Sequence, residues 1–201
     1  MRKVNGDSVG IDKDFHIANE SQVKPILSDL EKSRWKVQTV RRGERRRKPY
    51  APFRTSTMQQ EASRKLNFPV GKTMAIAQHL YQGEEGMDEG GLITYMRTDS
   101  VQVSPQSQQQ ARKFIGENYG EEYLPDSPPR YSKGKSSQEA HEAIRPTSIL
   151  RPPESIKDKL STDQYKLYRL IWVRFLSSQM SQAIFDTLRV DILATGKKRC
   201  I

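Results

Sequence analysis

Alternating side chains at both ends of the chain constrain its fold more than any other feature. Trp35, Val37 and Thr39 alternate with other residues near the N-terminus, and the same two-residue period recurs over about residues 184–196. A period of two indicates a β-strand. Since a single strand at the end of a chain has no partner of its own, the later strand must return to the strands of the first segment, or the chain has been cut short.

The chain divides into three segments on this pattern. Residues 1–50 predict a strand, a helix and a second strand, residues 51–181 are mainly helical, and residues 182–201 begin a return strand. The predicted fold class is therefore α+β: a mainly helical domain flanked by β-strand segments. Within the first segment we expect a strand at Phe15–Ile17 and a helix over Gln22–Ser33.

The helix ends of the first two segments can be placed from capping residues. Pro25 would be tolerated in the first turn of its helix, Thr57 and Gln60 form a capping box, and Ser104 precedes a proline at the first helical position. The middle segment should contain helices over about residues 57–66, 72–81, 104–118 and 162–180, a short strand at residues 92–96 and a long loop over residues 119–137. The core face of the last helix should consist of Leu167, Leu170, Ile171, Val173 and Phe175, with Trp172 at its side.

The charge of the chain favours a polyanionic partner. There are 34 basic and 24 acidic residues, with a net charge of +10; a basic surface kept only for solubility is the alternative. The single cysteine, Cys200, excludes an internal disulfide and a cysteine-based zinc site. No apolar run reaches membrane-spanning length, so we expect no membrane contact, and the single cysteine indicates an intracellular protein.

A basic run over residues 41–48 has two interpretations. It could contact phosphates, or it could be an exposed linker at a domain boundary, as the nearby Pro49 and Pro52 suggest. We favour the linker, with phosphate contact as a secondary role.

The segment GLITYMRTDS, residues 91–100, could carry chemistry. If it is an extended strand, Tyr95 and Arg97 project to the same side. A guanidinium beside a phenol favours the phenolate and can hold a phosphate oxygen, as phosphoryl transfer to tyrosine requires. A packed tyrosine with an exposed arginine is the structural alternative.

A second polar segment is SSQEAHEAIRPT, residues 136–147. If it is helical, Gln138, His141, Glu142 and Arg145 share one face and could bind a phosphate, with His141 donating a hydrogen bond or a proton. A solvated helix end is the alternative.

Other polar patterns predict structure rather than function. Asp12 and Asp14 lack a third acid and predict a turn, so we expect no metal site in this chain. Residues 71–73 (Gly-Lys-Thr) lack the upstream glycine of a P-loop and predict a helix start. His16 and His79 do not lie in a polar motif like that of His141, and we expect them to be structural or surface residues.

The two polar segments together resemble the signature motifs of type IA DNA topoisomerases. The stretches ITYMRTDS and QEAHEAIRPT carry the resemblance in the family's order, and APFRTSTMQQEASRKLNFPVGKTMAIAQHLY and LYRLIWVRFLSSQM extend it over essentially the whole chain. The resemblance implies that Tyr95 attacks single-stranded, negatively supercoiled DNA and forms a 5′-phosphotyrosine, that Arg97 binds the scissile phosphate, and that His141 hydrogen-bonds nearby. By motif position, Arg145, Glu142, Gln138, Thr98 and Ser100 would support DNA binding. The resemblance also implies a cytoplasmic, nucleoid-associated protein.

The same resemblance implies that half of the active site is missing. In this family a Toprim domain holds Mg²⁺ through acidic residues, and no segment here matches it. Residues before about 50 and after about 182 would belong to an arch that hinges the tyrosine domain, and we expect a fragment that does not relax DNA alone. A basic, non-catalytic single-stranded DNA-binding module is the alternative function. A tyrosine recombinase is disfavoured because His141 and Arg145 follow Tyr95 in the chain.

Overall fold

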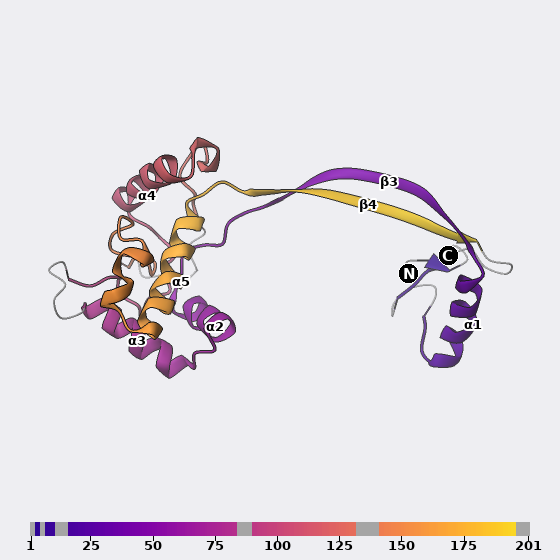
Figure 1. Ribbon diagram of the computed structural model, residues 1–201, viewed down its shortest axis with the longest axis horizontal. Coiled ribbons are helices and arrows are strands. Elements are labelled where there is room, and N and C mark those ends of the chain that lie inside the picture. The colour runs from indigo at the N-terminus through magenta and orange to yellow at the C-terminus, as the bar shows by residue number, and fades with distance from the viewer. Residues whose placement is uncertain (1–2, 5–6, 11–15, 84–89, 132–140, 196–201) are drawn as a thin grey trace. The chain divides into compact units, whose positions relative to one another are not determined.

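The computed structural model describes residues 3–4, 7–10, 16–83, 90–131 and 141–195 (Figure 1). The chain forms two compact units: one combines Met1–Arg46 with Ile184–Ile201, and the other is Arg47–Ala183. The sequence analysis places its segment boundaries near residues 50 and 181. The mixture of helices and strands confirms the α+β class.

The unit built from the chain ends contains four strands and one helix among its described residues. Strands β1 (Lys3–Val4) and β2 (Asp7–Ser8) pair with each other in antiparallel order. Helix α1 (Glu20–Glu31) follows, and Asn19 caps it by accepting a hydrogen bond from the Gln22 backbone. Strands β3 (Arg34–Arg47) and β4 (Ala183–Thr195) form a separate two-stranded sheet.

Strand β4, near the end of the chain, finds its partner in β3 of the first segment. The Thr39 hydroxyl donates to the Asp191 carboxylate at 2.9 Å, and the Thr187 hydroxyl donates to the Gly43 carbonyl at the same distance. These two contacts run in opposite order along the strands, as in an antiparallel pair. The later strand therefore returns to the first segment, which was one of the two predicted outcomes.

Three sequence expectations for this unit are wrong. His16 and Ile17 form no strand, and Phe15 lies outside the described residues, as do Asp12 and Asp14. Pro25 lies in the second turn of α1, because the helix begins two residues earlier than expected.

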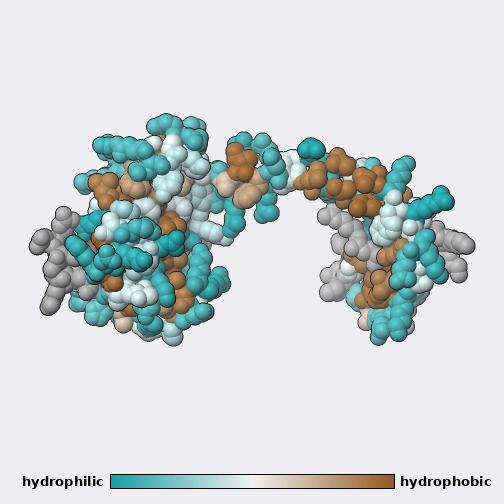
Figure 2. All heavy atoms as spheres, viewed as in Figure 1, coloured by the Kyte–Doolittle hydropathy of each residue, from teal (hydrophilic) through white to brown (hydrophobic). Residues whose placement is uncertain are grey.

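The basic run is the third error. Residues 41–47 belong to β3 rather than to a linker, since the strand continues through the run. Several large hydrophobic side chains of β3 and β4 are exposed: Trp35, Val37, Val40, Ile184, Phe185, Leu188, Val190 and Ile192. Figure 2 shows brown, hydrophobic atoms along this strand pair.

The second unit is helical, as predicted. Its elements are α2 (Thr55–Leu66), α3 (Val70–Gln82), α4 (Pro105–Asn118), the 3₁₀ helices η1 (Glu121–Tyr123) and η2 (Pro153–Lys159), and α5 (Thr162–Ser178). Helix α5 packs against α2, α3 and η2. The core between them is filled by large, fully buried side chains: Phe53, Met58, Leu80, Ile115, Leu167, Tyr168 and Ile171.

Capping explains where these helices begin. Ser104 caps α4 by accepting from the Ser107 backbone, with Pro105 at the first position as predicted. Ser161 caps α5 and exchanges hydrogen bonds with Gln164. In α2 the cap position is Arg54 rather than Thr57, whose hydroxyl accepts from the Arg54 N–H at 3.1 Å.

The remaining expectations for this unit are mixed. The Gly-Lys-Thr stretch does begin a helix, since it lies in the first turn of α3. The loop after α4 contains η1, which the sequence did not predict. Val173 is 46% exposed and does not belong to the core face of α5, whereas Trp172 is buried and packs edge-on against Phe114.

Candidate active site

Tyr95 lies on an irregular segment and not on the strand predicted for residues 92–96. Its only strand-like contact is a single bridge between Ile93 and Pro146. Side chains nevertheless alternate in this segment: Tyr95 and Arg97 are exposed, while Met96 and Thr98 are buried. The expectation that Tyr95 and Arg97 face the same way therefore holds for their exposure, without a regular strand.

The segment that bears Tyr95 is pressed against the end of α3. The Leu92 N–H donates to the Leu80 carbonyl at 2.7 Å. A Cβ atom on Gly91 would lie 1.9 Å from the Tyr81 carbonyl oxygen, so only glycine allows this approach. Tyr81 thereby comes close to Tyr95, and their rings meet edge to face with centroids 5.4 Å apart.

His141 approaches Tyr95 from the second polar segment. The two ring centroids are 6.4 Å apart, with planes tilted by 39°. Residues 141–147 are not helical, so the shared helix face predicted for this segment is wrong, and Gln138 lies outside the described residues. Backbone pairing, rather than a helix, brings His141 to Tyr95.

Thr94 holds these two segments together. Its backbone N–H donates to the Arg145 carbonyl at 2.9 Å, and its hydroxyl donates to the Ala143 carbonyl at 2.7 Å and accepts from the Arg145 N–H at 3.0 Å. Each of these bonds ties the residue before Tyr95 to the residues after His141. The relative position of the phenol and the imidazole is therefore fixed by three hydrogen bonds around one threonine.

A third segment joins the site through Thr55, the first residue of α2. Its backbone N–H donates to the Thr98 carbonyl at 2.9 Å. Its hydroxyl contacts the Met96 carbonyl at 2.8 Å and accepts from the Thr98 N–H at 2.9 Å. Thr55 thus binds the chain on both sides of Arg97.

A pocket lies where these segments meet. It has a volume of about 420 Å³ and is lined by Arg54, Thr55, Ser56, Arg97, Thr98, Asp99 and His141. Two arginines and a histidine face one aspartate, so the lining is positively charged overall. Such a pocket can hold an anionic group, and the exposed phenol of Tyr95 lies next to the His141 ring that lines it.

Comparison with known proteins agrees with the motifs. Residues 3–200 match the family model described as DNA topoisomerase. The chain belongs to this topoisomerase family. DNA topoisomerase 1 of Rickettsia felis is 47% identical over 186 residues, covering 92% of this chain and 24% of the relative. DNA topoisomerase 1 of Rickettsia prowazekii is 46% identical over 188 residues, with the same coverage. The resemblance to bacterial type IA topoisomerases is confirmed.

A solved topoisomerase shares the fold. Full-length topoisomerase I from Thermotoga maritima superposes with a TM-score of 0.75 and is 38% identical in sequence. The similarity covers 96% of this chain and 30% of the Thermotoga chain. This topoisomerase chain therefore spans about a quarter of the length of its curated relatives, at 24%, and less than a third of that solved structure.

Four of the residues predicted to bind DNA form internal hydrogen bonds in this topoisomerase chain. Thr98 and Ser100 are buried, and their hydroxyls accept from the backbone two residues later. The Arg145 side chain is 12% exposed, and its guanidinium pairs with the Glu142 carboxylate, which also accepts from the Ser104 N–H at 2.9 Å. These contacts support the loops around Tyr95, and a DNA-binding role for the four residues stays a prediction.

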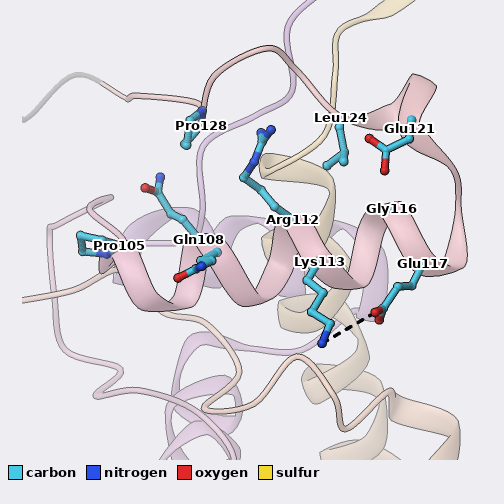
Figure 3. Close-up of a pocket in the computed structure, with 10 residues that line it drawn as sticks. Pro105, Gln108, Arg112, Lys113, Gly116, Glu117, Glu121, Leu124 and Pro128 are labelled. Carbon is cyan, nitrogen blue, oxygen red and sulfur yellow. Dashed lines mark ion pairs between the residues drawn. The ribbon is translucent and has the colours of Figure 1, made fainter.

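Sequence reasoning missed Arg54, Ser56 and Tyr81. All three lie in the stretch APFRTSTMQQEASRKLNFPVGKTMAIAQHLY that extends the family resemblance, but their local spacing does not single them out, because each reaches the site only through the tertiary fold. A second groove, along α4, contains none of the predicted site residues; Figure 3 shows Arg112 and Lys113 on its helical wall, where Lys113 pairs with Glu117.

The described residues contain neither a metal-binding cluster nor a membrane-spanning helix. Among them, no group of three or more His, Cys, Asp or Glu side chains is placed to hold a metal ion. No helix in residues 16–83, 90–131 or 141–195 is long and apolar enough to cross a membrane. Cys200 lies outside the described part of the chain.

Proposed function

We propose that this chain is the strand-cleaving part of a type IA DNA topoisomerase and that Tyr95 is its nucleophile. The observation that carries the proposal is the position of the Tyr95 ring. It is 42% exposed and lies 6.4 Å from the ring of His141, which lines a pocket together with Arg97. A tyrosine kept only for packing would have its ring buried and its hydroxyl bonded internally.

The reaction would exchange one phosphoester bond for another. The Tyr95 oxygen loses its proton and attacks the phosphorus, and the bond from phosphorus to the 3′ oxygen breaks. The leaving oxygen takes up a proton, so the products are a 5′-phosphotyrosine and a free 3′ hydroxyl. Attack by that hydroxyl on the phosphotyrosine reverses the step, and because bond energy is conserved in the link, no ATP is needed.

The neighbouring side chains have separate tasks in this reaction. Arg97 would bind the scissile phosphate and stabilise the charge that develops in the transition state. His141 would hydrogen-bond beside the same phosphate. Glu142 and Arg145 would keep the His141 loop in place through their ion pair, and Thr98, Ser100 and Gln138 would contact DNA as the motif match predicts.

The proposal requires partners beyond this chain. The substrate is single-stranded or negatively supercoiled DNA, whose relaxation follows from passing another strand through the cut. Magnesium would be bound by a Toprim domain of the parent enzyme, as the resemblance to the family implies. The unit built from the chain ends would be part of the arch that hinges the tyrosine domain.

A non-catalytic, basic single-stranded DNA-binding module is the second candidate. Its support is the net charge of +10, which favours phosphate binding with or without cleavage. Both candidates predict DNA binding that weakens with salt, so binding alone does not separate them.

Covalent capture of DNA separates the two. The chain is mixed with a purified Toprim domain, magnesium and an end-labelled single-stranded oligonucleotide, and denaturant-resistant adducts are resolved by electrophoresis. We expect an adduct with the wild type and with Tyr119→Phe, a control at a similarly exposed tyrosine (44%), and none with Tyr95→Phe. No adduct from the wild type would favour the binding module, and an adduct from Tyr95→Phe would refute the nucleophile.

A further inference from the structure

The pocket beside Tyr95 has a second arginine that the proposed reaction does not use. Arg54 lines it together with Arg97 and His141, although the three residues come from three separate parts of the chain. Arg54 precedes α2 and is exposed. Neither arginine forms an ion pair with another described residue, so both guanidinium groups are available to a ligand.

The two arginines are held in register by the fold. Thr55, which follows Arg54, donates its backbone N–H to the Thr98 carbonyl at 2.9 Å, and its hydroxyl contacts the Met96 carbonyl at 2.8 Å. These bonds hold Met96 and Thr98, the residues on either side of Arg97. The backbones that carry the two guanidinium groups therefore cannot move apart without breaking bonds inside the unit.

The charge of the pocket suits an anion. The guanidinium groups of Arg54 and Arg97 outweigh the single carboxylate of Asp99. A guanidinium presents a planar fork of N–H donors that matches phosphate oxygens. The Ser56 hydroxyl adds a neutral donor or acceptor in the same lining.

The two arginines of the pocket indicate more than one phosphate. Arg54 and Arg97 come from different segments and line the same space, which has a volume of about 420 Å³. One phosphate group bound to Arg97 would leave the Arg54 guanidinium without a phosphate. A nucleic-acid backbone supplies a second phosphate at a fixed distance from the first.

We propose that Arg54, assisted by Ser56, binds the DNA phosphate next to the one held by Arg97. The inference rests on the proposed function, because that function makes the Arg97 phosphate the scissile one. Arg54 is then a positioning residue: it fixes the register of the strand, so that one particular phosphate faces the Tyr95 oxygen.

Binding measurements on the full chain test this subsite without requiring cleavage. Fluorescence anisotropy with a labelled single-stranded oligonucleotide gives the affinity at several salt concentrations. Arg54→Ala should weaken binding several-fold and reduce the slope of log affinity against log salt by roughly 0.7, the value for one phosphate on a single strand. Arg64, an exposed arginine in the last turn of the same helix, is the control. Arg64→Ala should change the affinity and the salt slope less than Arg54→Ala does.

A scan with neutral phosphates tests the register. Methylphosphonates replace one phosphate at a time, and the position at which the neutral group removes the penalty of Arg54→Ala is recorded, as is the position for Arg97→Ala. We expect two adjacent positions, and Arg54→Lys should bind with intermediate affinity, since it keeps the charge without the fork.

Three results would overturn the inference: unchanged binding by Arg54→Ala, an equal loss for Arg64→Ala, or positions for Arg54 and Arg97 that are not adjacent. Failure of the proposed function would look different. The subsite would then still be found by binding, but the covalent adduct with Tyr95 would not form. A thermal unfolding curve for each variant shows that a loss of affinity does not reflect a loss of fold.

Discussion

At the scale of single residues, the side chains proposed to react with DNA differ from those that hold the segment in place. Tyr95 and Arg97 are exposed, whereas the residues that alternate with them are used inside the protein: Thr94 bonds to the His141 segment, and Met96 is fully buried. Because Thr94 and Met96 are fixed inside the protein, this irregular segment can hold the Tyr95 and Arg97 side chains as rigidly as a strand would. Rigid presentation matters because catalysis requires the reacting groups to be held close to their productive geometry.

Gly91 is the residue at which this packing is tightest. Gly91→Ala should destabilise the helical unit by about 1–3 kcal/mol or more, because the new Cβ would lie 1.9 Å from a backbone oxygen that cannot move aside easily. Gly71→Ala is the matched control: it lies in α3 with nothing within 4 Å of the new Cβ, and it should stabilise by up to about 1 kcal/mol.

Urea unfolding of the two alanine variants measures this difference. Equal stabilities for Gly91→Ala and Gly71→Ala would contradict the close approach of the Tyr95 segment to α3. Gly91→Ala should also lower adduct formation, since it displaces the segment that carries Tyr95.

At the scale of elements, the His141 loop depends on its link to α4. The Glu142 carboxylate accepts from the N–H of Ser104, the cap of α4, and also pairs with the largely buried Arg145. Glu142→Ala should cost about 1–3 kcal/mol of unfolding free energy, because it leaves a charged guanidinium without its partner. The adduct yield should fall further than stability alone explains, since His141 is the next residue.

The control for this prediction is an exposed ion pair in the same unit. Glu154 pairs with Arg169 at 3.8 Å, and both side chains are more than half exposed, at 68% and 59%. Glu154→Ala should cost less than about 1 kcal/mol. Chemical denaturation of both variants, with adduct yield measured in parallel, makes the comparison; a Glu142→Ala variant as stable as Glu154→Ala would show that the loop does not depend on the carboxylate.

The sequence predicted the helices and long strands well, because these elements follow local rules. Ser104 and Pro105 mark the start of α4 in the sequence, and the period of two marks β3 and β4. It predicted Tyr95, Arg97 and His141 as candidates from motif resemblance. It failed for residues 92–96 and 141–147, which form neither strand nor helix, because their backbone bonds go to residues about 50 positions away.

Long-range pairing also explains the residues that were missed. Arg54 and Tyr81 come to the site through the Thr55 bonds and the Gly91 contact, and neither contact follows from local spacing. The basic run was assigned to a linker because charged residues and nearby prolines outweighed strand propensity in that interpretation. In the structure it continues β3, since β4 supplies the backbone partner that no local pattern shows.

At the scale of the whole molecule, the described parts of the site lie within one unit. Arg54, Tyr95, Arg97 and His141 all belong to Arg47–Ala183, so one folded body presents the nucleophile and its pocket. The stability of that unit therefore limits the activity proposed for the chain.

Alkaline pH should weaken the helical unit through its buried tyrosines. Burial raises the pKa of Tyr131 from its usual value of about 10 to about 12, with Arg174 opposing the shift, and burial also raises the pKa of Tyr168. Since the pKa is higher in the folded state, stability is complete below pH 10 and is lost as the pH rises from about 10 through 12. Unfolding free energy measured against pH should show this decline.

Tyr131→Phe isolates one part of that decline. The variant should lose about 1 kcal/mol at neutral pH, because the Tyr131 hydroxyl donates to the Ser178 carbonyl at 2.7 Å. Between about pH 10 and 12 it should lose less additional stability than the wild type does. An identical slope in that range would show that Tyr131 does not contribute.

The central claim, that Tyr95 becomes covalently linked to DNA, is tested most directly by locating the link. The adduct formed with the Toprim domain and magnesium is digested with trypsin and nuclease, and the modified peptide is sequenced by mass spectrometry. Cleavage after Lys72 and Arg97 gives a peptide that contains both Tyr81 and Tyr95, so fragment ions must distinguish them. We predict a nucleotide joined through its 5′ phosphate to Tyr95. A nucleotide on Tyr81 or on any other residue, or one joined through its 3′ phosphate, would contradict the claim.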